Sequence, residues 1–172
     1  MSITAEELLQ RYAAGERDFS GVDLSGVNLS GLRLGNFNLS NANLRGANLR
    51  GAYLGDTILV SANLVETELS DADLRYVNLL NANLENTILD GARLTNVSMI
   101  NANLEGASLR NSDLRWASVE YSNFRRTSLE GTIWDEAGVW EVDFTGASGV
   151  EPQGKGWYNV IMPNGQFVES TW

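Results

Sequence analysis

The sequence predicts an all-β solenoid, a right-handed quadrilateral parallel β-helix closed by a short N-terminal α-helical cap and a C-terminal capping hairpin or loop. Three regularities support this prediction. A large apolar residue stands at every fifth position from Phe19 to Phe144, and Leu fills 19 of these 26 positions. Gly or Asn follows two residues later in 16 of the 26 cases, and whole segments recur with a period of 20. Neither the helical period of about 3.6 residues nor the strand period of about 2 explains this spacing.

The region 1–16 is interpreted as an N-terminal helical cap, with the helix itself over residues 5–14. Thr4 and Glu7 have the spacing of a capping box, in which side chains satisfy the free N–H groups of the first turn. Gly15 is placed to end the helix. We expect the apolar face of this helix to cover the first coil. A helix that binds a partner instead is the alternative.

Residues 17–147 form the predicted β-helix, in which each five-residue unit makes one side of a coil. Ala42 and Leu44 point inward because they lie two residues apart in an extended segment. Gly46 then turns the chain at a corner that requires positive φ, as at the third position of a type II turn. The period of 20 implies four sides per coil. It also stacks one column of asparagines, which is formed by Asn43, Asn63, Asn83, Asn103 and Asn123.

Residues 148–172 are interpreted as a C-terminal capping segment. A loop is expected at 151–156, and two apolar stretches then flank the residues Pro163-Asn164-Gly165, which is the signal of a hairpin. Trp157 and Phe167 are the expected packing groups of this plug. A free tail that binds a partner is the alternative.

The repeated unit resembles the pentapeptide-repeat family, whose motif is written A(D/N)LXX, and the resemblance covers about residues 17–147. The ends resemble a narrower, cyanobacterial group. Residues 11–21 look like the opening of its members, and residues 161–165 look like their C-terminal Met-Pro-Asp-Gly element with Asn164 in place of Asp. The resemblance implies the four-sided right-handed β-helix that the periodicity predicts. Function does not follow from a fold alone.

The composition excludes several classes of function. The net charge is −10, which argues against nucleic-acid binding, because that affinity comes from Lys and Arg. The chain has no His and no Cys, so the common nucleophilic triads and His- or Cys-based metal sites cannot form. We expect no catalytic residue, no cofactor and no metal. The N-terminus lacks the pattern of an export signal, and no apolar run is long enough for a membrane span, which predicts a cytoplasmic protein without membrane contact.

Two groups of outward residues depart from the polar pattern and form the predicted partner surface. The first is an aliphatic column in three successive coils. The second combines aromatic residues with arginines, a composition typical of binding hot spots. The eleven residues are Ile58, Val60, Leu80, Ile100, Tyr53, Tyr76, Arg75, Arg93, Arg115, Trp116 and Tyr121. Packing of neighbouring side chains along the stack is the simpler alternative for both groups.

The predicted function is a non-catalytic scaffold or regulator that presents a β-helix surface to an unidentified protein partner. The alternative is a DNA mimic that inhibits or protects DNA gyrase, because some relatives in the family are acidic rods of that kind. Arginines such as Arg45, Arg75 and Arg110 interrupt the acidic columns, whereas a mimic needs a continuous negative stripe. We expect a monomer and keep a dimer as the alternative.

Overall fold

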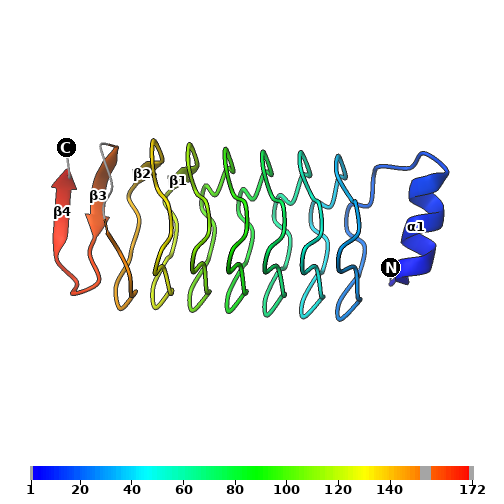
Figure 1. Ribbon diagram of the computed structural model, residues 1–172, viewed down its shortest axis with the longest axis horizontal. Helices are drawn as coiled ribbons and strands as arrows, with labels where there is room; N and C mark the ends of the chain where they lie inside the picture. Colours follow the sequence, from blue (N-terminus) through cyan, green and yellow to red (C-terminus); the bar gives the residue numbers. More distant parts are fainter. Residues whose placement is uncertain (1, 152–155, 171–172) are drawn as a thin grey trace.

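The computed structural model describes residues 2–151 and 156–170, so part of the loop expected at 151–156 lies outside the described residues. The molecule is an elongated stack of coils with helix α1 (Ala5–Ala13) at one end and a hairpin at the other (Figure 1). Parallel bridges join residues 20 apart, from Asp18↔Asn38 to Ser128↔Ser148. A β-helix solenoid with the predicted coil length is therefore confirmed.

Each coil has four five-residue sides, which we number along the coil formed by residues 42–61. Sides 1, 2, 3 and 4 contain residues 42–46, 47–51, 52–56 and 57–61, together with the residues 20 positions before and after them. A column is a set of residues at the same position in successive coils. Every fifth residue from Gly21 to Gly146 has positive φ, which confirms the predicted corners.

The core is one continuous cluster of apolar side chains, which point inward from all four sides along the axis of the stack. The Leu series is buried throughout, as in Leu44, Leu64 and Leu84, each with 0% of its surface exposed. Ala fills many of the inward positions two residues earlier. Where Thr replaces Ala, its hydroxyl is buried and donates to a backbone carbonyl. Thr67 Oγ1, for example, donates to Leu44 O of the preceding coil at 2.8 Å, so the buried hydroxyl is paired.

The predicted asparagine column is present on side 1. Asn63 Nδ2 donates to Asn43 Oδ1, Asn103 Nδ2 to Asn83 Oδ1, and Asn123 Nδ2 to Asn103 Oδ1, each at 3.0 Å. The same oxygens also accept the backbone N–H two residues later; Asn83 Oδ1, for example, accepts from Glu85 N at 3.2 Å. Each amide therefore ties two coils together and fixes the local turn at the same time.

The N-terminal helix covers the first coil as expected, and it ends one residue earlier than predicted. Thr4 Oγ1 accepts a hydrogen bond from Glu7 N at 3.1 Å, which confirms the predicted cap. Ile3 is buried, and its N–H donates to Asp23 O at 3.1 Å, so the segment before the helix extends the parallel stack. The end of the stack is thus protected from edge-to-edge pairing with other chains.

The C-terminal end is an incomplete further coil followed by a hairpin. Strands β1 (Ser118–Glu120), β2 (Gly138–Trp140) and β3 (Trp157–Ile161) pair in parallel, and β4 (Phe167–Ser170) returns antiparallel to β3. Val139 of β2 pairs with Trp157 and not with Asn159, where the regular period would place its partner, so this last coil is shortened. The paired hairpin confirms the predicted plug and excludes a free tail over β3 and β4.

The two expected packing groups of the plug behave differently. Trp157 is fully buried, and its ring lies 5.2 Å from that of Trp134 inside the last coils. The prediction for Phe167 is wrong, because 61% of its surface is exposed. Phe167 pairs with Ile161, which continues the outward column of Asp143, and paired residues of a sheet project to the same face.

Candidate interaction surface

The structure sorts the eleven predicted surface residues onto two adjoining sides. Side 3 carries the aromatic and arginine group, which consists of Tyr53, Arg75, Tyr76, Arg93, Arg115 and Trp116. Side 4 carries the aliphatic group, Ile58, Val60, Leu80 and Ile100, and Tyr121 stands at its far corner. Tyr121 is therefore separated from the aromatic column of Tyr76 and Trp116 by the width of side 4.

The aliphatic column of side 4 runs through three successive coils. Ser61 N donates to Leu80 O and Asn81 N to Ile100 O, so Val60, Leu80 and Ile100 lie directly above one another. Each of the three is half-buried, because its neighbours in the column cover it. Ile58 is more open, with 43% of its surface exposed. The column is a continuous apolar ridge rather than a set of fully exposed groups.

The aromatic residues at the corners have an unfavourable backbone conformation. Tyr76, Trp116 and Tyr121 have φ values of 62°, 56° and 54°, in the left-handed region that suits Gly and Asn. Their side chains are also 59%, 53% and 51% exposed. Bulky aromatic residues at these positions therefore combine backbone strain with little packing in return.

Tyr53 adopts a different arrangement, flat against side 3. A Cβ atom at Gly35 would lie 2.5 Å from Tyr53 Cε1, and one at Gly55 would lie 2.8 Å from its hydroxyl oxygen. The two buried glycines therefore make the shallow recess that holds the ring. Arg33 covers the ring with its guanidinium carbon 4.9 Å from the centroid. Tyr53 is consequently part of the side-3 surface without projecting from it.

Two of the three predicted arginines are held by aspartates of the same side. Arg75 Nε and Nη2 donate to Asp73 at 2.8 and 2.7 Å, and Arg115 Nε and Nη2 donate to Asp113 at 2.9 and 2.6 Å. Arg93 is held much more loosely: its side chain is 64% exposed, and its Nη1 lies 3.8 Å from Asp73 Oδ2. Side 3 therefore presents two fixed guanidinium groups and one loosely held cation.

The ion pairs lower the pKa values of both aspartates. For Asp113, the side-chain hydrogen bonds from Arg115 are the largest cause of the lowered pKa, and they outweigh the opposing effect of partial burial. For Asp73, partial burial raises the pKa, but hydrogen bonds from the Arg75 side chain and backbone N–H together lower it further. Both carboxylates are therefore ionised at neutral pH and keep their arginines in place.

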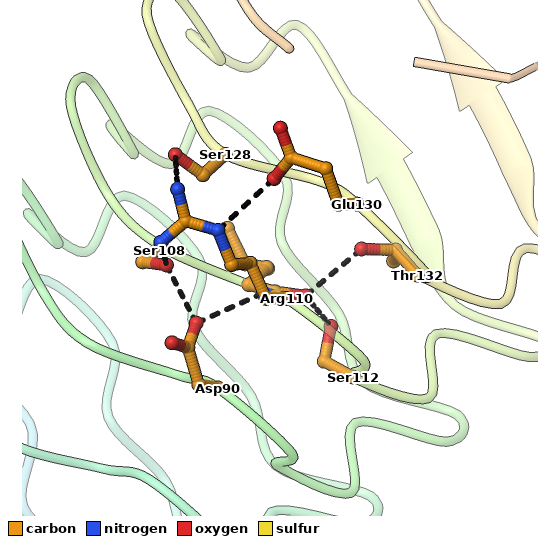
Figure 2. A network of polar contacts seen from close by, with 8 residues as sticks. Asp90, Ser108, Arg110, Ser112, Ser128, Glu130 and Thr132 are labelled. Carbon is orange, nitrogen blue, oxygen red and sulfur yellow. Dashed lines mark hydrogen bonds and ion pairs between the residues drawn. The ribbon is translucent and has the colours of Figure 1, made fainter. Parts of the chain in front are cut away.

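Figure 2 shows a polar network on side 2, which illustrates how acidic residues are distributed over the rod. Arg110 lies between acidic residues of the neighbouring coils. Its backbone N–H donates to Asp90 Oδ1 at 2.9 Å, and its Nε donates to Glu130 Oε2 at 3.1 Å. The hydroxyls of Ser108 and Ser128 complete the network (Figure 2). This column therefore alternates acidic and basic residues over these three coils.

The prediction missed three exposed aromatic residues at the C-terminal end, namely Trp140, Tyr158 and Phe167. Phe167 lines an open hollow of about 420 Å³, whereas Trp140 and Tyr158, whose rings lie 6.0 Å apart, line a separate hollow of about 520 Å³. The spacing could have revealed Trp140, because it stands two coils after Ile100 in the same column. The other two depend on the shortened last coil, which no repeat predicts.

Among residues 2–151 and 156–170, no group of three or more metal-ligating side chains is gathered at one place. Within the same described part of the chain, no helix has the length and apolar character of a membrane span.

Comparison with known proteins gives a consistent assignment. The family model for pentapeptide repeats matches in eight copies, over residues 23–60, 38–75, 59–91 and 78–115. A pentapeptide repeat protein of the Arabidopsis thaliana thylakoid lumen is 34% identical, with a TM-score of 0.57 over 60% of this chain and 72% of that one. Rfr23 from the cyanobacterium Cyanothece 51142 is 32% identical over 78% of this chain and 98% of its own, with a TM-score of 0.39.

A third solved structure is similar in fold alone. QnrB1, a plasmid-mediated fluoroquinolone resistance protein, is 18% identical, with a TM-score of 0.64 over 86% of this chain and 82% of that one. No curated protein matches the sequence significantly.

Proposed function

Because the chain belongs to the pentapeptide repeat family, we propose that it is a non-catalytic scaffold whose sides 3 and 4 present a binding surface to a protein partner. One observation carries this proposal. Tyr76, Trp116 and Tyr121 occupy strained left-handed corners while more than half of each side chain is exposed. Aromatic residues of this kind supply much of the affinity in protein interfaces.

A non-glycine residue in the left-handed region costs about 1–2 kcal/mol relative to the ordinary helical region, and Asn tolerates it better than a bulky residue. Asn already occupies seven of the other corners. Charged residues such as Glu66 and Arg126 carry the same backbone strain, so the distinguishing feature of the three aromatic corners is an exposed ring, which binding explains better than folding.

The test compares capture of proteins from native extract by three immobilised forms of the chain. The first is the wild type. The second replaces Tyr76, Trp116 and Tyr121 by Asn, which fits the corner geometry. The third is Ile88→Asn, a control on side 2 where an apolar side chain is 41% exposed. Captured proteins are quantified by mass spectrometry, and circular dichroism and thermal melting establish that each form is folded.

We expect specific partners to be retained by the wild type and by Ile88→Asn and to be depleted about tenfold or more with the triple variant. Replacement of Val60, Leu80 and Ile100 by Arg should have a similar effect if the apolar ridge belongs to the same interface. Equal capture by all forms would show that neither side 3 nor side 4 is the binding surface.

The gyrase-directed DNA mimic remains the second candidate. It draws on the net charge of −10 and on the fold shared with a fluoroquinolone resistance protein. Inter-coil ion pairs weigh against it, because Arg45 pairs with Glu66 at 3.0 Å and Arg126 pairs with Glu105, so cations interrupt the carboxylates of side 1. A DNA supercoiling assay with added protein separates the candidates: only a mimic should alter the rate or the drug sensitivity of gyrase.

Three further expectations belong to the proposal. They are the right-handed sense of the coils, the monomeric state and the cytoplasmic location. A crystal structure would test the first, light scattering coupled to size-exclusion chromatography the second, and fractionation of cells the third.

A further inference from the structure

The first five coils of side 3 differ in charge from the other sides. In the coils between residues 32 and 121, side 3 carries Arg33, Arg75, Arg93 and Arg115 against Asp56, Asp73 and Asp113. Over the same coils, each of the other three sides has more acidic residues than arginines. This stretch of side 3 is therefore slightly positive in a protein with a net charge of −10, and the next coil of the same side adds Asp135 and Glu136. Such a stretch favours a negatively charged partner.

The same four-residue module occurs twice on this side. The module has the same position on side 3 in two coils, with one coil between them. Its two copies are Asp73-Leu74-Arg75-Tyr76 and Asp113-Leu114-Arg115-Trp116. In both modules the Asp carboxylate accepts two hydrogen bonds from the Arg side chain, and the aromatic residue occupies the corner at positive φ. The two modules are about 10 Å apart, since coils stack at the spacing of β-strands.

The coil between the modules completes the arrangement. Arg93 pairs in the parallel stack with both Asp73 and Asp113, and most of its side chain is exposed. Asn96 stands at the corner between Tyr76 and Trp116, and its side chain is smaller than either ring. Arg93 is therefore a cation between the two modules, and the smaller Asn96 leaves a lower surface between the rings of Tyr76 and Trp116.

These groups favour an acidic protein segment over other ligands. A guanidinium has five N–H donors, so Arg75 and Arg115 keep donors for a partner after binding their aspartates, and Arg93 keeps almost all of its own. The exposed rings offer apolar contact to neighbouring side chains of the same segment. Nucleic acid is disfavoured, because the surrounding sides repel a dense line of phosphates.

We propose that side 3 binds an acidic segment of the partner protein, whose carboxylates contact Arg75, Arg93 and Arg115 and whose apolar side chains pack against Tyr76 and Trp116. This inference rests on the proposed scaffold function and adds the chemistry of the partner. The segment would lie across the coils, since the two modules repeat in that direction.

The test uses fluorescence anisotropy with a labelled synthetic peptide of repeated Glu-Ala-Glu-Trp units and the full-length chain. A peptide in which Gln replaces Glu carries no side-chain charge and measures contact through the aromatic residues alone. The key variant is Arg93→Glu, because Arg93 has little structural pairing. Arg50→Glu on side 2 is the matched control: its side chain is 65% exposed against 64% for Arg93, and the change in net charge is the same.

We expect the acidic peptide to bind the wild type, to bind Arg93→Glu about tenfold more weakly, and to bind Arg50→Glu with less than a twofold change. Equal weakening by the two variants would mean a general charge effect and would overturn the inference. So would absence of binding to the wild type, or equal binding of the Gln peptide. Two other results would also overturn the inference. If labelled single-stranded DNA binds and Arg93→Glu abolishes that binding, the ligand of side 3 is nucleic acid. If the wild type is a dimer that Arg93→Glu dissociates, side 3 binds a second copy of the chain.

Failure here is distinguishable from failure of the scaffold proposal. If extract partners depend on the aromatic corners while the acidic peptide does not bind, the scaffold stands and the acidic segment is wrong. If the aromatic corners also prove irrelevant to capture, both proposals fall together.

Discussion

Replacement of one core leucine should unfold or severely destabilise the protein. Leu84 lies in a middle coil with 0% of its surface exposed, between Leu64 and Leu104 of the adjacent coils. Leu84→Asp removes about 1.5–3 kcal/mol of apolar burial and places an unpaired carboxylate in the core, at a cost of several kcal/mol more. A total above about 4 kcal/mol is a large part of the stability of a typical domain.

Leu80→Asp is the matched control, because it makes the same chemical change four residues earlier at a half-buried, outward position. There the new carboxylate reaches water, and we expect a loss of about 1 kcal/mol or less. Urea denaturation followed by circular dichroism and by tryptophan fluorescence measures both variants. Equal losses for the two variants, or a wild-type midpoint for Leu84→Asp, would refute the inward orientation of Leu84 on which the assignment of sides depends.

Three further predictions follow from local contacts. Gly55→Ala should lower the unfolding free energy by about 1–2 kcal/mol, because its Cβ meets the Tyr53 ring, and in the background of Tyr53→Ala this loss should largely disappear in a double-mutant cycle. Thr87→Val should cost about 1 kcal/mol in urea denaturation, since its buried hydroxyl donates to a carbonyl of the preceding coil. Because folding lowers the pKa of Asp113, its contribution to stability is complete above about pH 4 and is lost as the pH falls through the folded pKa. Thermal melting between about pH 5 and pH 3 should therefore show a smaller fall for Asp113→Asn than for the wild type.

The geometry of the coils could be predicted from the sequence, because the same steric requirements recur in every repeat. Leu44 and Leu64 had to point inward and Gly46 had to turn the chain, and the next coils impose the same requirement at the same positions. Even corners without Gly or Asn follow this geometry, such as Glu66 with a φ of 58°. The 16 corners with Gly or Asn impose the same turn on the other ten, since a coil that failed to turn would lose its pairing with both neighbours.

The details of the surface and of the last coil could not be predicted in this way. The position of Tyr53 over Gly35 and Gly55 depends on two absent Cβ atoms in separate coils, and nothing in a repeat pattern indicates which neighbour will cover them. The prediction for Phe167 fails because the shortened β2–β3 register puts its partner Ile161 in an outward column. Both features arise where the sequence departs from its own period.

The separation of core from surface explains how this fold can carry strained aromatic residues. In a solenoid each coil contacts only its neighbours, so stability is close to a sum of local terms. A strained corner such as Trp116 therefore lowers the stability of its own coil, while the buried Leu114 two residues away keeps the chain in register. Outward positions can change for binding while the inward positions hold the coil. The residues that depart most from the sterically favoured choice, Tyr76 and Trp116 with their paired arginines, are for that reason the strongest candidates for contact with a partner.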